Sequence, residues 1–255
     1  MITPVGAGAI AHGQMPFHNP ISETAIDGLI DRLPLQPGDE MLDVGCGRGE
    51  LLIRIAKRHG TGGFGIDTSE EQIAIATLEA AARVPDAALR FEAGDAGAID
   101  APPSSFALGA CVGSTHALGG LQGTLSRLSE LVKPGGLVLV GEGFWTHRPE
   151  RELLEAIGAT EDELTDYPTL LAAGTAHGLA PVYAVTSTGA DWERYEWAYL
   201  FNAECYAREH PDEDGVELLR ERVEWTRRRR SLAARDGETL GFALILWRSE
   251  RSVQA

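Results

Sequence analysis

Apolar and polar residues follow two different patterns along the chain from about residue 40. Short continuous apolar runs predict β-strands, whereas segments in which apolar residues recur every three or four positions predict helices. The predicted strands cover residues 40–45, 62–67, 88–94, 105–112 and 136–142. The predicted helices between them cover residues 50–59, 69–83 and 119–132. Regular alternation of this kind is typical of an α/β fold, in which helices cover both faces of a doubly wound parallel sheet.

The pattern changes after the fifth predicted strand, because helical segments become longer and strands rarer. The remaining predicted elements are helices at 149–157, 168–178, 191–209 and 212–235, and strands at 181–187 and 241–247. The last strand is apolar enough to be buried on both faces of a sheet. We interpret residues 189–236 as a helical insertion between the sixth and seventh strands of a seven-stranded, mostly parallel sheet.

The segment before the first strand carries a helical signal of its own. Ser22 is a suitable N-cap, and an apolar stripe follows at Ala25, Leu29, Ile30 and Leu33, which predicts a helix over residues 22–33. The first 15 residues are expected to be loosely ordered. Because 255 residues lie within what one hydrophobic core supports, we expect a single domain. Its expected parts are an N-terminal extension and helix at 1–36, a ligand-binding core at 37–188, the insertion at 189–236, and the last strand and tail at 237–255.

The composition narrows the range of partners and compartments. The 22 basic against 38 acidic residues give a formal net charge of −16, which disfavours nucleic acid and other phosphate-rich partners. The basic run Arg227 to Arg230 lies among glutamates, and we interpret it as a solvated helix end with intrahelical ion pairs. No apolar run approaches the roughly 18 residues of a membrane span, so we expect a cytoplasmic protein without a membrane anchor. Three distant cysteines indicate neither a disulfide framework nor a zinc cluster.

A glycine-rich turn follows the first predicted strand. Asp43-Val44-Gly45-Cys46-Gly47-Arg48-Gly49 leads directly into a helical pattern, and its glycines permit positive φ and close approach of a ligand to the backbone. A dinucleotide fingerprint would need its third glycine at position 50, where the chain has Glu50. This mismatch disfavours a nicotinamide-dependent oxidoreductase, which remains the competing class of enzyme.

Two further acids end the second and third strands. Asp67 lies about twenty residues after the glycine turn, where a carboxylate can accept both hydroxyls of a ribose. Asp95 ends the third strand, and a Pro134-Gly135-Gly136 turn precedes the fifth. Because ligands of such sheets bind beyond the carboxyl ends of the strands, we expect these acids to gather at one site with Cys111 and Glu142.

The pattern Asp-x-Gly-x-Gly-x-Gly at residues 43–49 resembles the first motif of the class I S-adenosylmethionine-dependent methyltransferases. The resemblance implies a Rossmann-like fold and S-adenosylmethionine as the cofactor, with Asp67 on the ribose, Asp95 on the adenine amine and the Ala96 backbone against the ring. The full set of cofactor-binding residues that it implies is Asp43, Gly45, Cys46, Gly47, Asp67, Thr68, Asp95, Ala96 and Cys111. Segments at 18–20, 110–113, 141–145 and 192–196 resemble a smaller family of bacterial small-molecule methyltransferases without assigned substrates.

Three residues are candidates for the proton acceptor or the acceptor contact. His116 follows the fourth strand, where a neutral imidazole could face the departing methyl group; alternatively it is a helix-start or core histidine bonded to backbone. Glu142 ends an apolar strand, so it either meets the substrate or pairs with an arginine such as Arg194. The sequence alone indicates a surface histidine at His18. It is a candidate site residue only because segment 18–20 resembles the smaller methyltransferase family.

Aromatic residues provide a candidate pocket for the methyl acceptor. Trp145, Trp192 and Tyr195 could form its wall, although aromatics at helical spacing are more often plain packing. The insertion could act as a lid over this pocket, extend the helical layer, or form the contact of a homodimer. No cluster has metal-ligand spacing, so we expect a metal-independent transferase that methylates nitrogen, oxygen or sulfur of a small molecule. The alternative to an enzyme is a protein that binds S-adenosylmethionine without transferring its methyl group.

Overall fold

The computed structural model describes residues 1–252, apart from the side chain of Val5. The chain divides into two compact units, which are described separately. The sheet unit comprises Glu23–Glu142, Pro168–Thr186 and the C-terminal segment from Ala243. The helical unit comprises Met1–Ser22, Gly143–Tyr167 and Ser187–Phe242.

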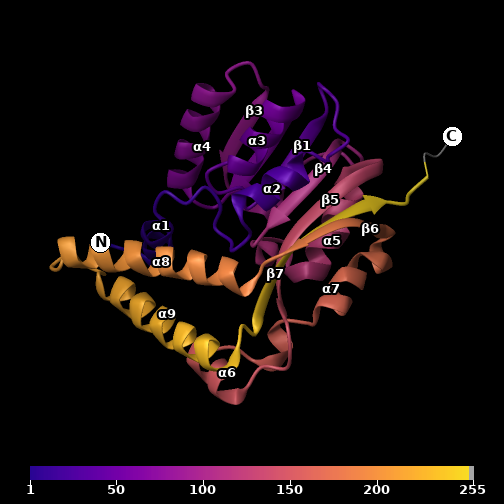
Figure 1. Cartoon of the computed structure of the whole chain (residues 1–255). Coiled ribbons are helices and arrows are strands. Elements are labelled where there is room, and N and C mark those ends of the chain that lie inside the picture. Colours follow the sequence, from indigo (N-terminus) through magenta and orange to yellow (C-terminus); the bar gives the residue numbers. More distant parts are fainter. Residues whose placement is uncertain (253–255) are drawn as a thin grey trace. The chain divides into compact units, whose positions relative to one another are not determined.

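The sheet unit is built on a seven-stranded sheet with the strand order β3-β2-β1-β4-β5-β7-β6 (Figure 1). Its strands are β1 (Glu40–Val44), β2 (Gly62–Asp67), β3 (Leu89–Ala93), β4 (Phe106–Val112), β5 (Val132–Trp145), β6 (Leu179–Thr186) and β7 (Leu240–Ser249). Parallel pairing joins β3, β2, β1, β4 and β5, whereas β6 runs antiparallel to β7. This topology confirms the predicted Rossmann-like, mostly parallel sheet.

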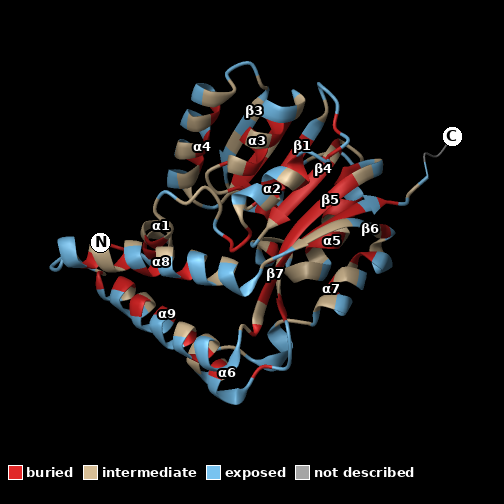
Figure 2. Cartoon of the chain, in the orientation of Figure 1, coloured by how far each residue is buried: buried red, intermediate tan, exposed pale blue. Residues whose placement is uncertain are grey.

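Helices of the sheet unit follow the strands, as the periodicity predicts. They are α2 (Glu23–Ile30), α3 (Glu50–His59), α4 (Glu70–Arg83), α5 (Gly120–Leu131) and α7 (Tyr167–Ala172), with short 3₁₀ turns η1 (Ala96–Ala98), η2 (Thr115–Leu118) and η4 (Ala173–His177). The helix α3 begins after Gly49 and ends at Gly60, both left-handed, and buries the leucine and isoleucine face of its amphipathic sequence. The central strands form the core of this unit, where Val44 and Leu139 are fully buried (Figure 2).

The helical unit contains α1 (Pro4–His12), α6 (Arg151–Ile157), η3 (Glu161–Glu163), α8 (Gly189–Glu209) and α9 (Glu217–Asp236). Small residues allow α1, α8 and α9 to pack closely, since Ala7, Ala11 and Ala203 are fully buried with Leu219 in one apolar cluster. The two long helices confirm the predicted helical insertion before the last strand. None of the helices in residues 1–252 is long and apolar enough to cross a membrane.

The expectation that the first 15 residues are loosely ordered was wrong. Pro4 begins helix α1, and the hydroxyl of Thr3 caps it by accepting a hydrogen bond from the Gly6 amide at 3.0 Å. The sequence signal was a capping residue followed by proline, which is favoured in the first helical turn. The small residues that then follow give no apolar stripe, although Ala7 and Ala11 are buried.

The basic run in α9 differs from its interpretation as a solvated helix end. Arg227 does form an intrahelical pair with Glu224, but Arg229 is only 1% exposed. Arg229 binds Glu196 of α8 and Glu238 beyond the end of α9, and Arg230 joins the same two carboxylates at 2.9 and 2.8 Å. Two of the four arginines therefore link α9 to its neighbours within the helical unit.

Candidate active site

The glycine turn after β1 combines a packed side and an open side. Gly45, Gly47 and Gly49 have φ angles of 69°, 50° and 73°, in the left-handed region that favours glycine. A Cβ atom at Gly45 would lie 2.3 Å from the Cβ of Ser114, in the loop after β4, whereas a Cβ at Gly47 would meet no atom within 4 Å. The turn therefore packs closely against the sheet unit at Gly45 and leaves open space at Gly47.

Asp67 fixes this turn to the end of β2. Its Oδ2 accepts a hydrogen bond from the Gly47 amide at 2.9 Å, and its Oδ1 accepts one from the Ser69 amide at the same distance. Each carboxylate oxygen can accept more than one hydrogen bond, so Asp67 retains capacity for two hydroxyl donors of a ligand.

Asp43 is a buried carboxylate at the base of the turn. Its residue is 3% exposed, and no hydrogen bond reaches its carboxylate from the rest of residues 1–252. Burial, together with the negative charge of Asp67, raises the pKa of Asp43 to about 7. A buried acid without a donor can be satisfied by a ligand cation, because an ammonium group supplies both hydrogen bonds and charge.

The remaining cofactor candidates lie in the sheet unit near the ends of β1 to β4. Asp95 is exposed and caps η1 by accepting the Gly97 amide at 2.9 Å, while Ala96 is buried and Thr68 is exposed beside Asp67. Cys46 and Cys111 are buried, and burial raises the pKa of both thiols, that of Cys111 to about 12. Neutral buried thiols of this kind serve as apolar filler.

Glu142 and His116 lie near the carboxyl ends of the neighbouring strands β5 and β4. The hydroxyl of Thr115 in η2 donates a short hydrogen bond of 2.5 Å to Oε2 of Glu142 in the last part of β5. His116 follows Thr115 and is exposed. Arg194, the alternative partner that the sequence suggested for Glu142, instead binds Asp191 at 2.7 Å within its own helix. The loop after β4 thus brings a histidine and an oriented carboxylate to the edge of the sheet that carries the glycine turn.

The other candidates, His18, Trp145, Trp192 and Tyr195, lie in the helical unit. His18 stacks on His12, with ring centroids 3.9 Å apart. The indole of Trp145 is buried and donates to the carbonyl of Glu161 at 2.8 Å, which is the environment of a core residue. Trp192 and Tyr195 line a pocket of about 570 Å³ among α1, α8 and α9.

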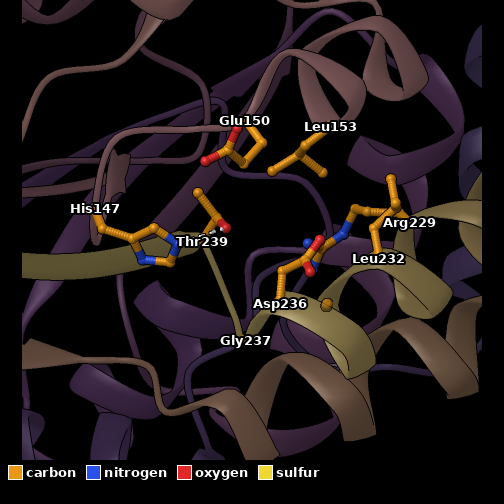
Figure 3. Close-up of a pocket in the computed structure, with 9 residues that line it drawn as sticks. His147, Glu150, Leu153, Arg229, Leu232, Asp236, Gly237 and Thr239 are labelled. Atoms are coloured by element: carbon orange, nitrogen blue, oxygen red, sulfur yellow. Dashed lines mark hydrogen bonds between the residues drawn. The ribbon is translucent and has the colours of Figure 1, made fainter.

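A second hollow of the helical unit is too small for a substrate. It measures about 20 Å³ and lies between the segment after β5 and the end of α9. Figure 3 shows His147 and Thr239 side by side in its lining, where the Thr239 hydroxyl lies 3.1 Å from Nε2 of His147. Space of this size suits about one water molecule.

Several residues of the two units have contacts that the sequence interpretation missed. Glu50, which occupies the place of a dinucleotide-site glycine, pairs with Arg83 and Arg54. Although burial alone would raise the pKa of Glu50, hydrogen bonds from these arginines lower it. Thr115 orients Glu142, and Arg222 lines the pocket with Trp192. Apart from the Glu50–Arg54 pair, which has the i,i+4 spacing of a helix, these contacts join residues far apart in the chain, so no local spacing signals them.

Comparison with known proteins agrees with this geometry. Residues 41–136 match a family model described as a methyltransferase domain. The uncharacterized protein YjhP of Escherichia coli is 33% identical over 92% of this chain and 96% of its own length. A crystal structure of an S-adenosylmethionine-dependent methyltransferase from Geobacter sulfurreducens in complex with S-adenosylhomocysteine is 30% identical, with a TM-score of 0.86 over 97% of this chain and 99% of that one.

A more distant relative has a named activity. The 27-O-demethylrifamycin SV methyltransferase of Amycolatopsis mediterranei is 32% identical over 51% of this chain and 50% of its own length. The competing interpretation as a nicotinamide-dependent oxidoreductase was wrong, because two solved structures that match nearly the whole chain are S-adenosylmethionine-dependent methyltransferases in complex with S-adenosylhomocysteine. The glycine turn, the carboxylates beside it and these relatives together show that the chain belongs to the class I methyltransferases that use S-adenosylmethionine.

Proposed function

We propose that the enzyme transfers the methyl group of S-adenosylmethionine to a nitrogen, oxygen or sulfur atom of a small molecule, by in-line displacement and without a metal. The observation that carries this proposal is the arrangement at the carboxyl edge of the sheet. There the glycine turn and Asp67 lie in the same unit as the Thr115–Glu142 pair and His116. The named activity of the rifamycin-methylating relative supports a small acceptor.

Roles for the cofactor-binding residues follow from their chemistry. The carboxylate of Asp67 would accept the ribose hydroxyls, and the open space at Gly47 would admit the cofactor beside the backbone. Asp43, buried without a donor, would hold the ammonium group. Asp95 would accept the adenine amine, with Ala96 against the ring. When bound, the cofactor supplies an electrophilic methyl group on its sulfonium.

The residues of this chain then have to position the acceptor and manage its proton. Orientation of two reactants can supply roughly 7–11 kcal/mol of a barrier, whereas a general base contributes about 10²–10⁴ in rate. Glu142 suits acceptor positioning because Thr115 holds one of its oxygens. The exposed imidazole of His116 suits transient proton acceptance from the acceptor. We assign His18 a supporting role through its stack on His12.

Metal independence is the part of the proposal that a chelator tests directly. Within residues 1–252, no group of three or more histidine, cysteine or acidic side chains is placed to hold a metal ion. We expect methyl transfer to survive exhaustive dialysis against EDTA. Activity that disappears on dialysis and returns with Mg²⁺ would contradict this part alone.

The decisive experiment measures methyl transfer while the acceptor is still unidentified. The purified protein is incubated with methyl-labelled S-adenosylmethionine and fractionated metabolite extracts, and both S-adenosylhomocysteine and labelled small molecules are followed by mass spectrometry. We expect stoichiometric formation of the two products in at least one fraction. A protein that binds without transferring methyl would show affinity for both adenosyl ligands in calorimetry but form neither product. Label found only on protein or nucleic acid would contradict the small acceptor.

A further inference from the structure

The pocket of about 570 Å³ in the helical unit has the size and the walls of a ligand site. Pockets for small organic ligands commonly measure about 300–1,000 Å³ and combine apolar walls with a few polar groups. All lining residues belong to one unit, from α1, α8 and α9. Its aromatic walls are Trp192, Tyr195, Tyr199 and Trp225. Four aromatic side chains around one hollow favour a flat apolar body.

Arg222 is the polar feature that points to the charge of the ligand. Its guanidinium donates to the Tyr199 hydroxyl at 2.6 Å and to the Pro4 carbonyl at 2.9 Å. It has no carboxylate partner in the described part of the chain. Two of its five N–H donors are therefore used, both on neutral acceptors, and the half-buried charge remains uncompensated. Such a guanidinium is suited to bind a carboxylate through paired hydrogen bonds.

Trp192 supplies a second donor without a partner. Its indole Nε1 is buried, and none of residues 1–252 offers it a hydrogen-bond acceptor. A buried polar group that lacks a partner in a native structure calls for an explanation, and an absent ligand is one. The ring lines the pocket, so an oxygen atom of a ligand beside it could accept this hydrogen bond after a small shift of the ring.

The charges around the pocket disfavour a cation, the usual occupant of an aromatic cage. The guanidinium of Arg229 already lies over the Trp192 ring, 4.9 Å from its centroid. Burial and the neighbouring His18 and Arg222 lower the pKa of His12 to about 3, so this lining imidazole is neutral. Glu196 is paired with two arginines. Glu221 also lines the pocket, but it is exposed, and water screens its charge.

We propose that the pocket among α1, α8 and α9 binds a small organic acid whose flat apolar body lies between the aromatic rings and whose carboxylate pairs with Arg222. Tyr199 strengthens this arrangement, because its hydroxyl accepts from Arg222 and keeps its own proton for the ligand. The proposal concerns binding within the helical unit and does not depend on methyl transfer. A binding measurement therefore tests the proposal by itself. If the protein did not transfer methyl, the binding of the organic acid could still be measured and interpreted.

Three probes that share one ring system separate charge from shape. The full-length protein is titrated by calorimetry with 2-naphthoate, with neutral 2-naphthamide and with cationic 2-naphthylmethylammonium, without S-adenosylmethionine. We expect 2-naphthoate to bind at least about tenfold more tightly than the amide, the scale of a charge-assisted hydrogen bond, and the cation to bind most weakly. Equal affinity for all three probes, or no binding by 2-naphthoate, would overturn the proposal.

Variants then assign the effect to this pocket. Arg222→Gln should abolish the preference for 2-naphthoate, whereas Arg222→Lys should retain a preference for the anion. Arg220→Gln is the matched control, because Arg220 lies on the same helix but pairs with Glu217 and does not line the pocket. If Arg222→Gln unfolds the helices, the test rests on Arg222→Lys. A folded Arg222→Lys protein that no longer prefers 2-naphthoate over the amide would contradict the role of the positive charge.

A spectroscopic readout locates the probe beside Trp192. The chain has five tryptophans, so the ¹⁵N-labelled protein gives five indole N–H signals, and Trp192→Phe identifies one of them. We expect 2-naphthoate to move that signal downfield, because its oxygen satisfies the unpartnered Nε1. Movement of the other indole signals with no change at Trp192 would place the probe elsewhere and overturn the assignment.

Discussion

The amide of Gly47 donates a hydrogen bond of 2.9 Å to Oδ2 of Asp67, which ties the glycine turn after β1 to the carboxylate that ends β2. This hydrogen bond holds the backbone after β1 and the Asp67 side chain at the end of β2 in a fixed arrangement before any ligand binds. Ser69 secures the other oxygen of the same carboxylate. A binding site that is ordered in advance loses less conformational entropy when its ligand arrives.

Asp67→Ala should weaken S-adenosylmethionine binding by about 2–4 kcal/mol, because two hydrogen bonds to a charged acceptor are lost. The variant also frees the amide of Gly47, so the turn itself should become less ordered. Calorimetric titration with S-adenosylmethionine measures the change. Asp86→Ala is the matched control, since Asp86 is an exposed acid of the same unit. Unchanged affinity in Asp67→Ala would remove this residue from the cofactor site.

Alanine substitutions at two glycines of the same turn should differ in how much stability they cost. At Gly47 the added Cβ meets no protein atom within 4 Å, so the folded state loses only about 1–2 kcal/mol for the positive φ, while the cofactor is blocked. At Gly45 the Cβ would collide with Ser114, so Gly45→Ala should lose stability as well. Urea unfolding and cofactor titration of both variants test this difference. A Gly47→Ala protein that binds normally would contradict the placement of the cofactor.

The sequence predicts the sheet unit well because its signals are local. Apolar runs and helical periodicity predicted the strands and helices. Because strand ends of a parallel sheet converge on one edge, Asp43, Gly45 and Asp67 were expected at one site, while the cofactor itself was implied by the resemblance of residues 43–49 to a methyltransferase motif. The contacts of the helical unit were not predictable in this way. Arg229 reads as one of four surface arginines, and its burial depends on carboxylates 33 and 9 residues away in the chain.

The helix α1 escaped prediction for a related reason. Its sequence is rich in alanine and glycine, and nothing in it distinguishes a buried alanine from an exposed one. Ala7 and Ala11 are buried because α8 presents its own alanine, Ala203, at the contact. Close packing of small residues is a property of the pair of helices, so the apolar stripe that marks an amphipathic helix is missing.

Cofactor affinity should rise with pH between about 5.5 and 7.5, because the ionised form of Asp43 binds the ammonium group and its pKa in the free protein is about 7. The upper end of this pH range lies below the pKa of an α-amino group, roughly 7.7–8.0, so the ammonium group of the cofactor stays protonated throughout. Calorimetry in buffers of different ionisation enthalpy should show proton release on binding below pH 7. Asp43→Asn should bind more weakly and without this pH dependence. A slope that persists in Asp43→Asn would assign it to another group.

The same raised pKa predicts a gain in stability for Asp43→Asn. A carboxyl group whose pKa is higher in the folded than in the unfolded protein favours folding less and less as the pH rises from about 4 to 7. The cofactor-free variant should therefore be more stable than the parent protein at pH 8, by about 1–4 kcal/mol, and similar to it at pH 4. Urea unfolding at both pH values measures the effect. Lower stability of the variant at pH 8 would show that Asp43 has a stabilising partner.

Glu142→Gln should impair methyl transfer without changing cofactor affinity, because the role proposed for this carboxylate, which Thr115 holds, is contact with the acceptor. Its loss should cost about 10²–10⁴ in kcat if the residue also accepts the proton, and mainly raise KM if it only positions the acceptor. The measurement uses the acceptor found by mass spectrometry. His116→Ala, assayed alongside, identifies which residue carries a pH-dependent rate. Glu92→Gln is the control, since Glu92 is an exposed carboxylate of β3.

Arg229→Met should destabilise the helical unit, because the guanidinium is 1% exposed and bonded to both Glu196 and Glu238. Removing one partner of a buried ion pair typically costs about 3–5 kcal/mol, since the remaining carboxylates stay buried without full compensation. Arg230 still contacts both carboxylates, so the loss should fall at the lower end of that range. Thermal unfolding followed by far-ultraviolet circular dichroism measures it, with the adjacent exposed Arg228→Met as control. Equal unfolding temperatures for the two variants would mean that the ion pairs of Arg229 with Glu196 and Glu238 do not secure α9. Titration of Arg229→Met with S-adenosylmethionine would show whether the sheet unit binds its ligand independently of these helices.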